Sequence, residues 1–404
     1  MKQPYLILLV LICSFFASCS SGDQANSDQL NDGLEIIKVN LSEAREGKLS
    51  EFFEPEVQYI WLKDDSEDGL IGDGLQKIFF HEDKVFTLDI FGCHCVQIFD
   101  RSGKFLSKIR AYGEGPEKYL GFDDAIVVNN ELLLLGVFPP KLMWFSLEGK
   151  FIREEKLDKP IGSGVFSEED KRYYFYSKYR EPGEYLVETV NESFRDTLKF
   201  LPYQDDVYYG NFSNRNSFIK SEKIYLGRAF NDTIMVSGAG ELLPKFVFEF
   251  GEYGQAIDEM KRSEELEARE RSDFINKKAK LYFTPYNWYI TNSQFHAGFK
   301  YEVSYYNIFF DRKTQQTSVI KGRVSDDLTD SFDPYNLLYQ FEGDKVGFRV
   351  LGIELYKILQ KKKEELGQEG FEEYVRGKGK NFAQVAFAAK DSENPVLIVY
   401  TVKK

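Results

Sequence analysis

The feature that most constrains this chain is a segment that occurs twice, 46 residues apart. The stretch "QIFDRSGKFLSKI" at 97–109 aligns with "MWFSLEGKFIREEKL" at 143–157, so that Phe99 matches Phe145 and the turn glycines match as well. Each copy places apolar runs of strand length on both sides of a glycine-containing turn. Self-similarity at a fixed period of this length predicts an array of like units.

Both copies contain four segments with the alternating or continuous apolar pattern of a β-strand. The predicted strands are 74–80, 84–90, 96–100 and 104–109 in the first copy, and 124–128, 131–137, 142–147 and 151–157 in the second. Four short strands in one period are typical of a blade of a β-propeller.

Weaker copies follow at 172–201, 222–250 and 287–322, and a last copy near the C-terminus lacks one strand. The segment 56–62 near the start is a spare strand. A strand from one terminus that completes the blade of the other removes the open edge of the ring. We therefore predict an all-β, six-bladed β-propeller over 51–404, closed by pairing of its N- and C-terminal strands.

Two charged segments interrupt the strand pattern and are predicted to be helices. The first, 255–280, carries acid–base pairs at i,i+4, and the second, 353–378, breaks near its glycines. The strand order within a blade puts both insertions on the face that carries the links between blades. Loops on one face of a rigid scaffold often carry function, so we expect this face to be the binding surface. The alternative is that the helices only cap the channel.

The repeats also resemble a known family. The quoted pieces are "VQIFDRSGKFL", "YGEGPEKY" at 112–119, "NDTIMVSGAGELLPKFVFEFG" and the closing "DSENPVLIVYTVKK". With these, residues 52–404 resemble the NHL-like six-bladed β-propeller lipoproteins of Bacteroidota. The resemblance implies the fold and says little about activity, because propellers host many unrelated functions.

The N-terminus has the composition of a secretory signal. Lys2 precedes an apolar run over 5–16 and then small residues, a pattern too short for a membrane-spanning helix. The sequence "FASC", ending at Cys19, resembles the lipobox of bacterial lipoproteins, which implies that Cys19 is acylated and becomes the first mature residue. The alternative is an ordinary signal with a chance cysteine.

These features predict a signal peptide over 1–18 and a flexible tether over 19–50, rich in Ser, Asp and Asn. We expect a lipid-anchored protein of the cell envelope, in the outer membrane, facing the periplasm or the surface. The net charge of −13 argues against nucleic acid as a partner and against a basic patch that adsorbs to anionic lipid.

After processing, Cys93 and Cys95 are the remaining cysteines, and we predict free thiols, because residues i and i+2 of a strand seldom reach disulfide geometry. The "CHC" motif does not predict a metal site. Zinc would need further ligands, and the other histidines, His81 and His296, stand at no recognisable spacing. No resident metal or cofactor is predicted.

The glycine-rich link 112–119 resembles a phosphate loop superficially, but it precedes a strand, so we interpret its glycines as a tight crossing between blades. Its side chains Tyr112, Glu114 and Tyr119 are predicted to face the mouth of the channel. Asp123 and Asp124, which follow this link, form a pair of carboxylates that is a candidate calcium site.

The remaining candidate ligand-binding residues are aromatic and polar side chains in loops on the same face. They are Phe138, Tyr208, Tyr209, Asn231 and Asp232. Exposed aromatic rings beside acidic groups suit a sugar ring or a peptide.

No catalytic residues are predicted, because the chain has neither a G-x-S-x-G motif nor a triad-like context for its histidines. We expect a binding or interaction module for a protein, peptide or glycan. The alternatives are a channel-centred lyase or hydrolase, with or without calcium, and a purely structural component of the envelope.

Overall fold

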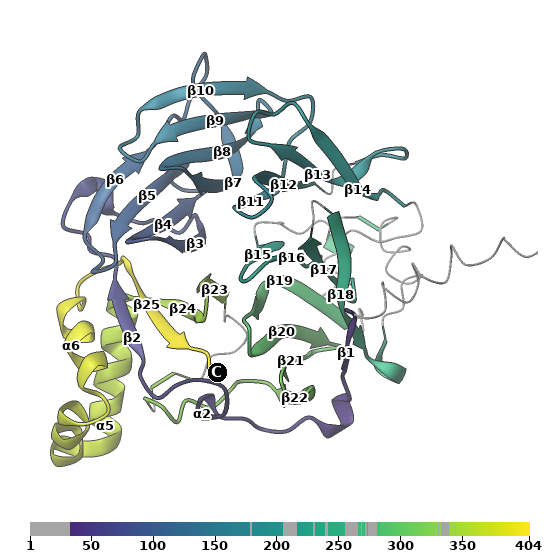
Figure 1. The fold of residues 1–404 in the computed structure, drawn as a ribbon. Coiled ribbons are helices and arrows are strands. Elements are labelled where there is room, and N and C mark those ends of the chain that lie inside the picture. Colours follow the sequence, from purple (N-terminus) through teal and green to yellow (C-terminus); the bar gives the residue numbers. More distant parts are fainter. Residues whose placement is uncertain are drawn as a thin grey trace, which may run out of the picture.

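The protein is a ring of six β-sheets, as a computed structural model shows (Figure 1). The six-bladed β-propeller predicted from the sequence is confirmed. The structure describes residues 33–177, 180–204, 216–228, 231–238, 241–254, 266–267, 269–270, 273, 281–329, 331–332 and 339–404.

Blades 1 and 2 are the two copies recognised in the sequence. Blade 1 contains β3 (Leu75–His81), β4 (Lys84–Asp89), β5 (Cys95–Asp100) and β6 (Phe105–Ile109), and blade 2 contains β7 (Gly121–Val128), β8 (Glu131–Phe138), β9 (Lys141–Ser146) and β10 (Phe151–Lys156). Phe99 pairs with Phe105, and Phe145 pairs with Phe151 in the same register. The ring centroids of the two pairs lie 5.7 and 5.8 Å apart, both edge to face. The repeat is therefore one of geometry as well as sequence.

Blades 3 to 5 follow the same order from the innermost strand outwards. They contain β11 (Ser163–Ser167), β12 (Arg172–Tyr176), β13 (Tyr185–Asn191) and β14 (Thr197–Pro202), then β15 (Phe218–Lys220), β16 (Ile224–Leu226), β17 (Thr233–Gly238) and β18 (Glu241–Glu249), then β19 (Leu281–Ile290), β20 (Gln294–Tyr301), β21 (Ser304–Asp311) and β22 (Gln316–Lys321).

Residues 35–50, predicted as part of a flexible tether, belong to the folded domain. Strand β1 (Glu35–Lys38) adds a fifth, parallel strand to blade 4, and the short helices η1 (Leu41–Glu43) and α2 (Leu49–Phe52) follow it. Ile37 and Leu49 are completely buried. The apolar side chains of this segment pack against blades 4 and 5, which fixes the chain.

Blade 6 closes the ring. Its strands are β23 (Tyr339–Glu342), β24 (Lys345–Leu351), β25 (Pro395–Thr401) and, as the outermost strand, β2 (Gln58–Trp61). Strand β2 from the N-terminal side pairs antiparallel with β25 at the C-terminus. The predicted closure is therefore confirmed.

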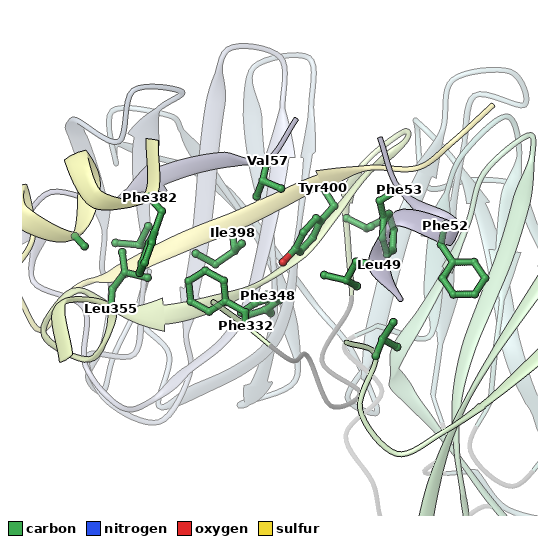
Figure 2. Close-up of a cluster of buried hydrophobic side chains, with 14 of the residues drawn as sticks. Leu49, Phe52, Phe53, Val57, Phe332, Phe348, Leu355, Phe382, Ile398 and Tyr400 are labelled. Atoms are coloured by element: carbon green, nitrogen blue, oxygen red, sulfur yellow. The ribbon is translucent and has the colours of Figure 1, made fainter. Parts of the chain in front are cut away.

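The second predicted insertion forms α5 (Gly352–Arg376), interrupted at Gly367 with a φ of 68°, and α6 (Lys380–Ala388). Both helices lie at the outer edge of blade 6 (Figure 1). Leu355 and Phe382 pack with Phe332 and Ile398 (Figure 2). This insertion covers the flank of a blade, so the alternative that it caps the channel is wrong.

The first predicted helix, 255–280, lies almost entirely outside the described residues, so a common face for the two insertions stays a prediction. Within the described part of the chain, no helix has the length and apolar character needed to cross a membrane.

Strands alternate in direction within each blade, which defines two faces of the ring. We call the face with the links between blades, and with the turns between second and third strands, the link face. The opposite face carries the turns between first and second strands, and we call it the turn face. The core lies between adjacent sheets, as where Phe86 and Ile98 of blade 1 pack with Leu132 and Phe145 of blade 2.

Candidate functional site

A cavity of about 360 Å³ lies on the axis of the propeller, and all six innermost strands contribute to it. These strands are β3, β7, β11, β15, β19 and β23. Its apolar lining comes from every blade and includes Phe80, Val127, Val165, Phe218, Trp288 and Phe341. A cavity of this size and character suits a small ligand, or one group of a larger ligand.

The cavity lies towards the turn face. It is lined by residues 77–81 of β3, 125–127 of β7 and 340–343 at the end of β23. These are the later parts of strands that run from the link face to the turn face. The binding surface predicted from the sequence is the link face, on the opposite side of the ring.

Asp124 joins three blades beside this cavity. Its completely buried carboxylate accepts from Lys77 Nζ of blade 1 at 2.7 Å, and from Ser163 Oγ and Gly164 N of blade 3 at 3.1 and 3.2 Å. The amide of Ala125 donates to the same carboxylate at 2.8 Å. With both oxygens bonded, the buried charge is compensated by donors from three innermost strands.

The other four junctions between neighbouring blades also carry a polar contact near the axis. They are Glu168–Lys220 at 3.9 Å, Trp288 Nε1 donating to Asn216 O at 2.9 Å, Gln340 Nε2 donating to Ile290 O at 3.0 Å, and Arg101–Glu342 at 2.6 Å. Together with Asp124 these contacts form what we call the axial ring. The ring links each blade to the next around the cavity.

The turn-face end of the cavity is charged, in contrast to its apolar interior. His81 is half-buried there, and burial lowers its pKa below the usual value of 6.5, so its imidazole is neutral at pH 7. The charges of Lys220, Glu168 and Glu342 act on it. Arg101 lies with its guanidinium carbon 4.2 Å from the centre of the Phe80 ring. The site can therefore take an apolar group inside and polar groups at its mouth.

The predicted residues of the 112–119 link separate in the structure. Tyr112 and Glu114 are exposed on the link face. Tyr119 is completely buried, and its hydroxyl donates to His94 O at 2.7 Å. Burial raises the pKa of Tyr119 to about 12. The prediction that Tyr119 faces the channel mouth is wrong, because the link folds back on itself and puts this ring into the core between blades 1 and 2.

The candidate calcium pair also separates. Asp123 is partly exposed on β7, whereas a cation at Asp124 would have to displace Lys77 and Ser163. Among the residues that the structure describes, no group of three or more His, Cys, Asp or Glu side chains could hold a metal ion.

Phe138 is 64% exposed at the end of β8, and its carbonyl accepts from Leu120 N at 2.8 Å, next to the link. Asn231 and Asp232 lie on blade 4, where their side chains accept from the backbone N–H and the hydroxyl of Thr233 and so stabilise the turn. The predicted residues Tyr208 and Tyr209 lie outside the described residues. The structure thus places Tyr112 and Phe138 beside one link, and the blade 4 pair elsewhere.

Cys93 and Cys95 form a disulfide with their Cα atoms 5.3 Å apart. The prediction of free thiols is wrong, because the segment is a turn and not an extended strand. His94 between them has a φ of 51°, in the left-handed region. The useful sequence signals were the position of the motif between two strands and the predicted secretory signal, because disulfides form in exported proteins.

Sequence reasoning also missed the cavity. Its lining residues belong to the first strand of each repeat, which the sequence analysis had located in most blades. Which of their side chains meet on the axis depends on the register between blades, and no residue pattern within a single repeat carries that information.

One solved structure supports the fold. The crystal structure of a protein from Bacteroides fragilis, described as a 'putative exported protein', matches this fold with a TM-score of 0.68. The two chains share 16% sequence identity, and the match covers 91% of this chain and all of that one. A quinonprotein alcohol dehydrogenase-like protein from Bacteroides thetaiotaomicron shares 13% identity over 62% of this chain and 56% of that one, with a TM-score of only 0.37.

A search of the curated proteins finds no match. A sequence family does match, and it covers the propeller from just before β1 to the end of β25. Over residues 34–401 the chain belongs to the family described as a domain of unknown function, DUF4934.

Proposed function

We propose that this protein is a binding module of the cell envelope and that its ligand enters the axial cavity from the turn face. The observation that carries the proposal is a cavity to which all six blades contribute, held by the axial ring. A site on rigid strands is preorganised, so binding loses little conformational entropy.

The chemistry of the lining suggests the kind of ligand. The interior is apolar and aromatic, and the mouth carries Lys220, Arg101, Glu168 and Glu342. We therefore propose a peptide or glycan partner that inserts one apolar or aromatic group and keeps its polar part at the mouth. The lyase or hydrolase alternative gains nothing from Asp124, whose oxygens are already bonded.

The test is to fill the cavity and measure binding of an apolar fluorescent probe, anilinonaphthalene sulfonate. Val165 lines the cavity and is partly buried, so Val165→Trp occupies part of the space. We expect saturable fluorescence enhancement with the unaltered protein and at least about tenfold weaker binding with Val165→Trp. Capture of partners from an envelope extract should fall in parallel.

The matched control is Val303→Trp, which places the same side chain at a 73% exposed position on the link face. This variant should bind the probe like the unaltered protein. Should Val165→Trp fail to fold, as judged by circular dichroism, Ser221→Trp at the edge of the cavity replaces it. Equal binding by the cavity and control variants would show that the axial cavity is not the site.

The cellular location is part of the same proposal. Support comes from the signal over 1–18, the lipobox-like Cys19 and the resemblance to NHL-like lipoproteins. We propose a lipid anchor at Cys19 that holds the propeller at the outer membrane. Labelling of growing cells with a radioactive fatty acid tests it: the unaltered protein should carry the label, and Cys19→Ser should not. Absence of label from the unaltered protein, or equal label in both forms, would contradict the anchor.

A further inference from the structure

We propose that the Cys93–Cys95 disulfide is a thiol–disulfide exchange site, which takes an external thiol at Cys93 and releases the 110–120 link when it is reduced. The site lies on the link face, away from the axial cavity, so the inference is independent of the proposed ligand site.

The two sulfur-bearing residues differ in access. Cys93 is partly exposed, whereas Cys95 is completely buried in β5. An incoming thiolate can therefore reach Cys93 and not Cys95, and this asymmetry sets the direction of attack.

The crosslink holds a costly backbone conformation. His94 is not a glycine, yet its φ is 51°, and left-handed backbone at such a residue persists only where its surroundings impose it. Here the disulfide joins the residues on either side of His94. Breaking the disulfide removes that constraint and allows His94 to return to an extended conformation.

Three contacts connect this turn to the 110–120 link. Arg110 Nε donates to Cys93 O at 2.9 Å, and the Tyr119 hydroxyl donates to His94 O at 2.7 Å. The His94 ring stacks on Tyr112, with centroids 4.4 Å apart and planes 9° apart. All three depend on the conformation of residues 93 and 94, so a change at the disulfide is transmitted to the link.

The fold of blade 1 does not depend on the crosslink. The disulfide spans a single residue, so it constrains the unfolded chain far less than a long-range bridge would. The neighbouring strands β4 and β5 stay paired through their own hydrogen bonds, from Leu88 opposite Val96 outwards. Reduction should therefore loosen the link locally and leave the propeller folded.

The exchange balances with thiols as the reductant. A thiolate RS⁻ attacks Cys93 Sγ, the bond between the two sulfur atoms breaks, and Cys95 leaves as a thiolate that takes a proton from water. A second RS⁻ attacks the external sulfur of the mixed disulfide, giving RSSR and a Cys93 thiolate, which is also protonated. Two thiols are oxidised and one disulfide is reduced.

The experiment equilibrates the natively folded full chain with mixtures of reduced and oxidised glutathione and then alkylates free thiols. Trypsin releases residues 85–101, which contain Cys93 and Cys95 and no other cysteine, while Cys13 and Cys19 fall in residues 3–38. We expect reversible conversion of the 85–101 peptide between disulfide and dithiol, and a glutathione adduct on Cys93 in Cys95→Ser. A disulfide that reduces only after unfolding, or thiols that never form one, would overturn the proposal.

Brief proteolysis of the native protein measures how accessible the 110–120 link is. Trypsin should cleave after Arg110 and Lys118 several-fold faster in the reduced protein, and Cys95→Ser should be cleaved at the faster rate whatever the glutathione ratio. Cleavage after Lys150, in the turn between β9 and β10 of blade 2, serves as the internal control and should not change. Equal cleavage rates after Arg110 and Lys118 in both redox states would refute the coupling to the link. This comparison uses the unaltered protein, so it holds even if Cys95→Ser misfolds.

Discussion

The channel and the interface between blades 5 and 6 each bury an ionisable side chain completely, and they accommodate it in opposite ways. Asp124 on the channel is ion-paired with Lys77 and accepts from three further donors. His296 in β20 bonds Asn307 Oδ1 through Nε2, at 3.1 Å, and its Nδ1 has no hydrogen-bond partner among the described residues. Burial lowers the pKa of His296 to about 4, so it is neutral at pH 7.

The two buried side chains have different structural roles. At the channel a buried carboxylate binds together strands from three blades, and its charge is compensated by donors. Between blades 5 and 6 the imidazole serves as an aromatic surface, stacked on Tyr289 and tilted against Phe309. A strongly shifted pKa is often a sign of a functional site, yet His296 does not line the axial cavity. The lowered pKa of His296 therefore reflects its burial in a packed interface.

The largest effect we expect comes from removing the channel carboxylate. Asp124→Ala leaves Lys77 as a partly buried cation without its partner, and leaves the buried Ser163 Oγ and Gly164 N without their acceptor. The free energy of unfolding should fall by about 3–5 kcal/mol. Urea denaturation at pH 7 measures it from the shift in midpoint at constant slope.

Asp123→Ala is the matched control, because Asp123 is the adjacent residue of the same strand and is partly exposed. It should cost no more than about 1 kcal/mol. A similar cost for the two variants would mean that the channel carboxylate contributes no more than a surface residue, and the comparison with His296 would lose its basis.

Much of the fold could be predicted, because the information is local. The turn glycine and the aromatic pair Phe99 and Phe105 of the first copy recur 46 residues later in the second copy, and each copy folds as one unit. The closing strand at 56–62 followed from counting strands and from the cost of an open edge.

The site could not be predicted in the same way, because it depends on contacts between repeats. Nothing in the neighbourhood of Asp124 indicates Lys77 or Ser163, which are 47 and 39 residues away in the chain. Tyr119 looked like a loop aromatic and became a core residue when the link folded back. The prediction of free thiols at Cys93 and Cys95 is wrong because the chain turns at His94, whereas the spacing rule applies to an extended strand.

The second prediction tests the His296 side of the comparison by acidification. The pKa of His296 is about 4 in the folded protein, below the ordinary value of 6.5. Between these two pH values the imidazole is protonated in the unfolded chain and neutral in the folded protein. This contribution to stability is fully present above pH 6.5 and is lost as the pH falls to 4, by about 3 kcal/mol in total. The measurement is the free energy of unfolding by urea at a series of pH values.

His296→Gln isolates the effect, since the amide can still donate to Asn307 but does not titrate. Buried carboxylates also change stability in acid, so the informative quantity is the difference between the two curves. The curve of the variant should be flatter than that of the unaltered protein by about 3 kcal/mol between pH 6.5 and 4. Parallel curves would mean that His296 binds a proton in the folded protein as readily as in the unfolded chain, with an acceptor for its second N–H. The neutral, packing role assigned to it would then have to be abandoned, and Asp124 and His296 would be two versions of the same compensated charge.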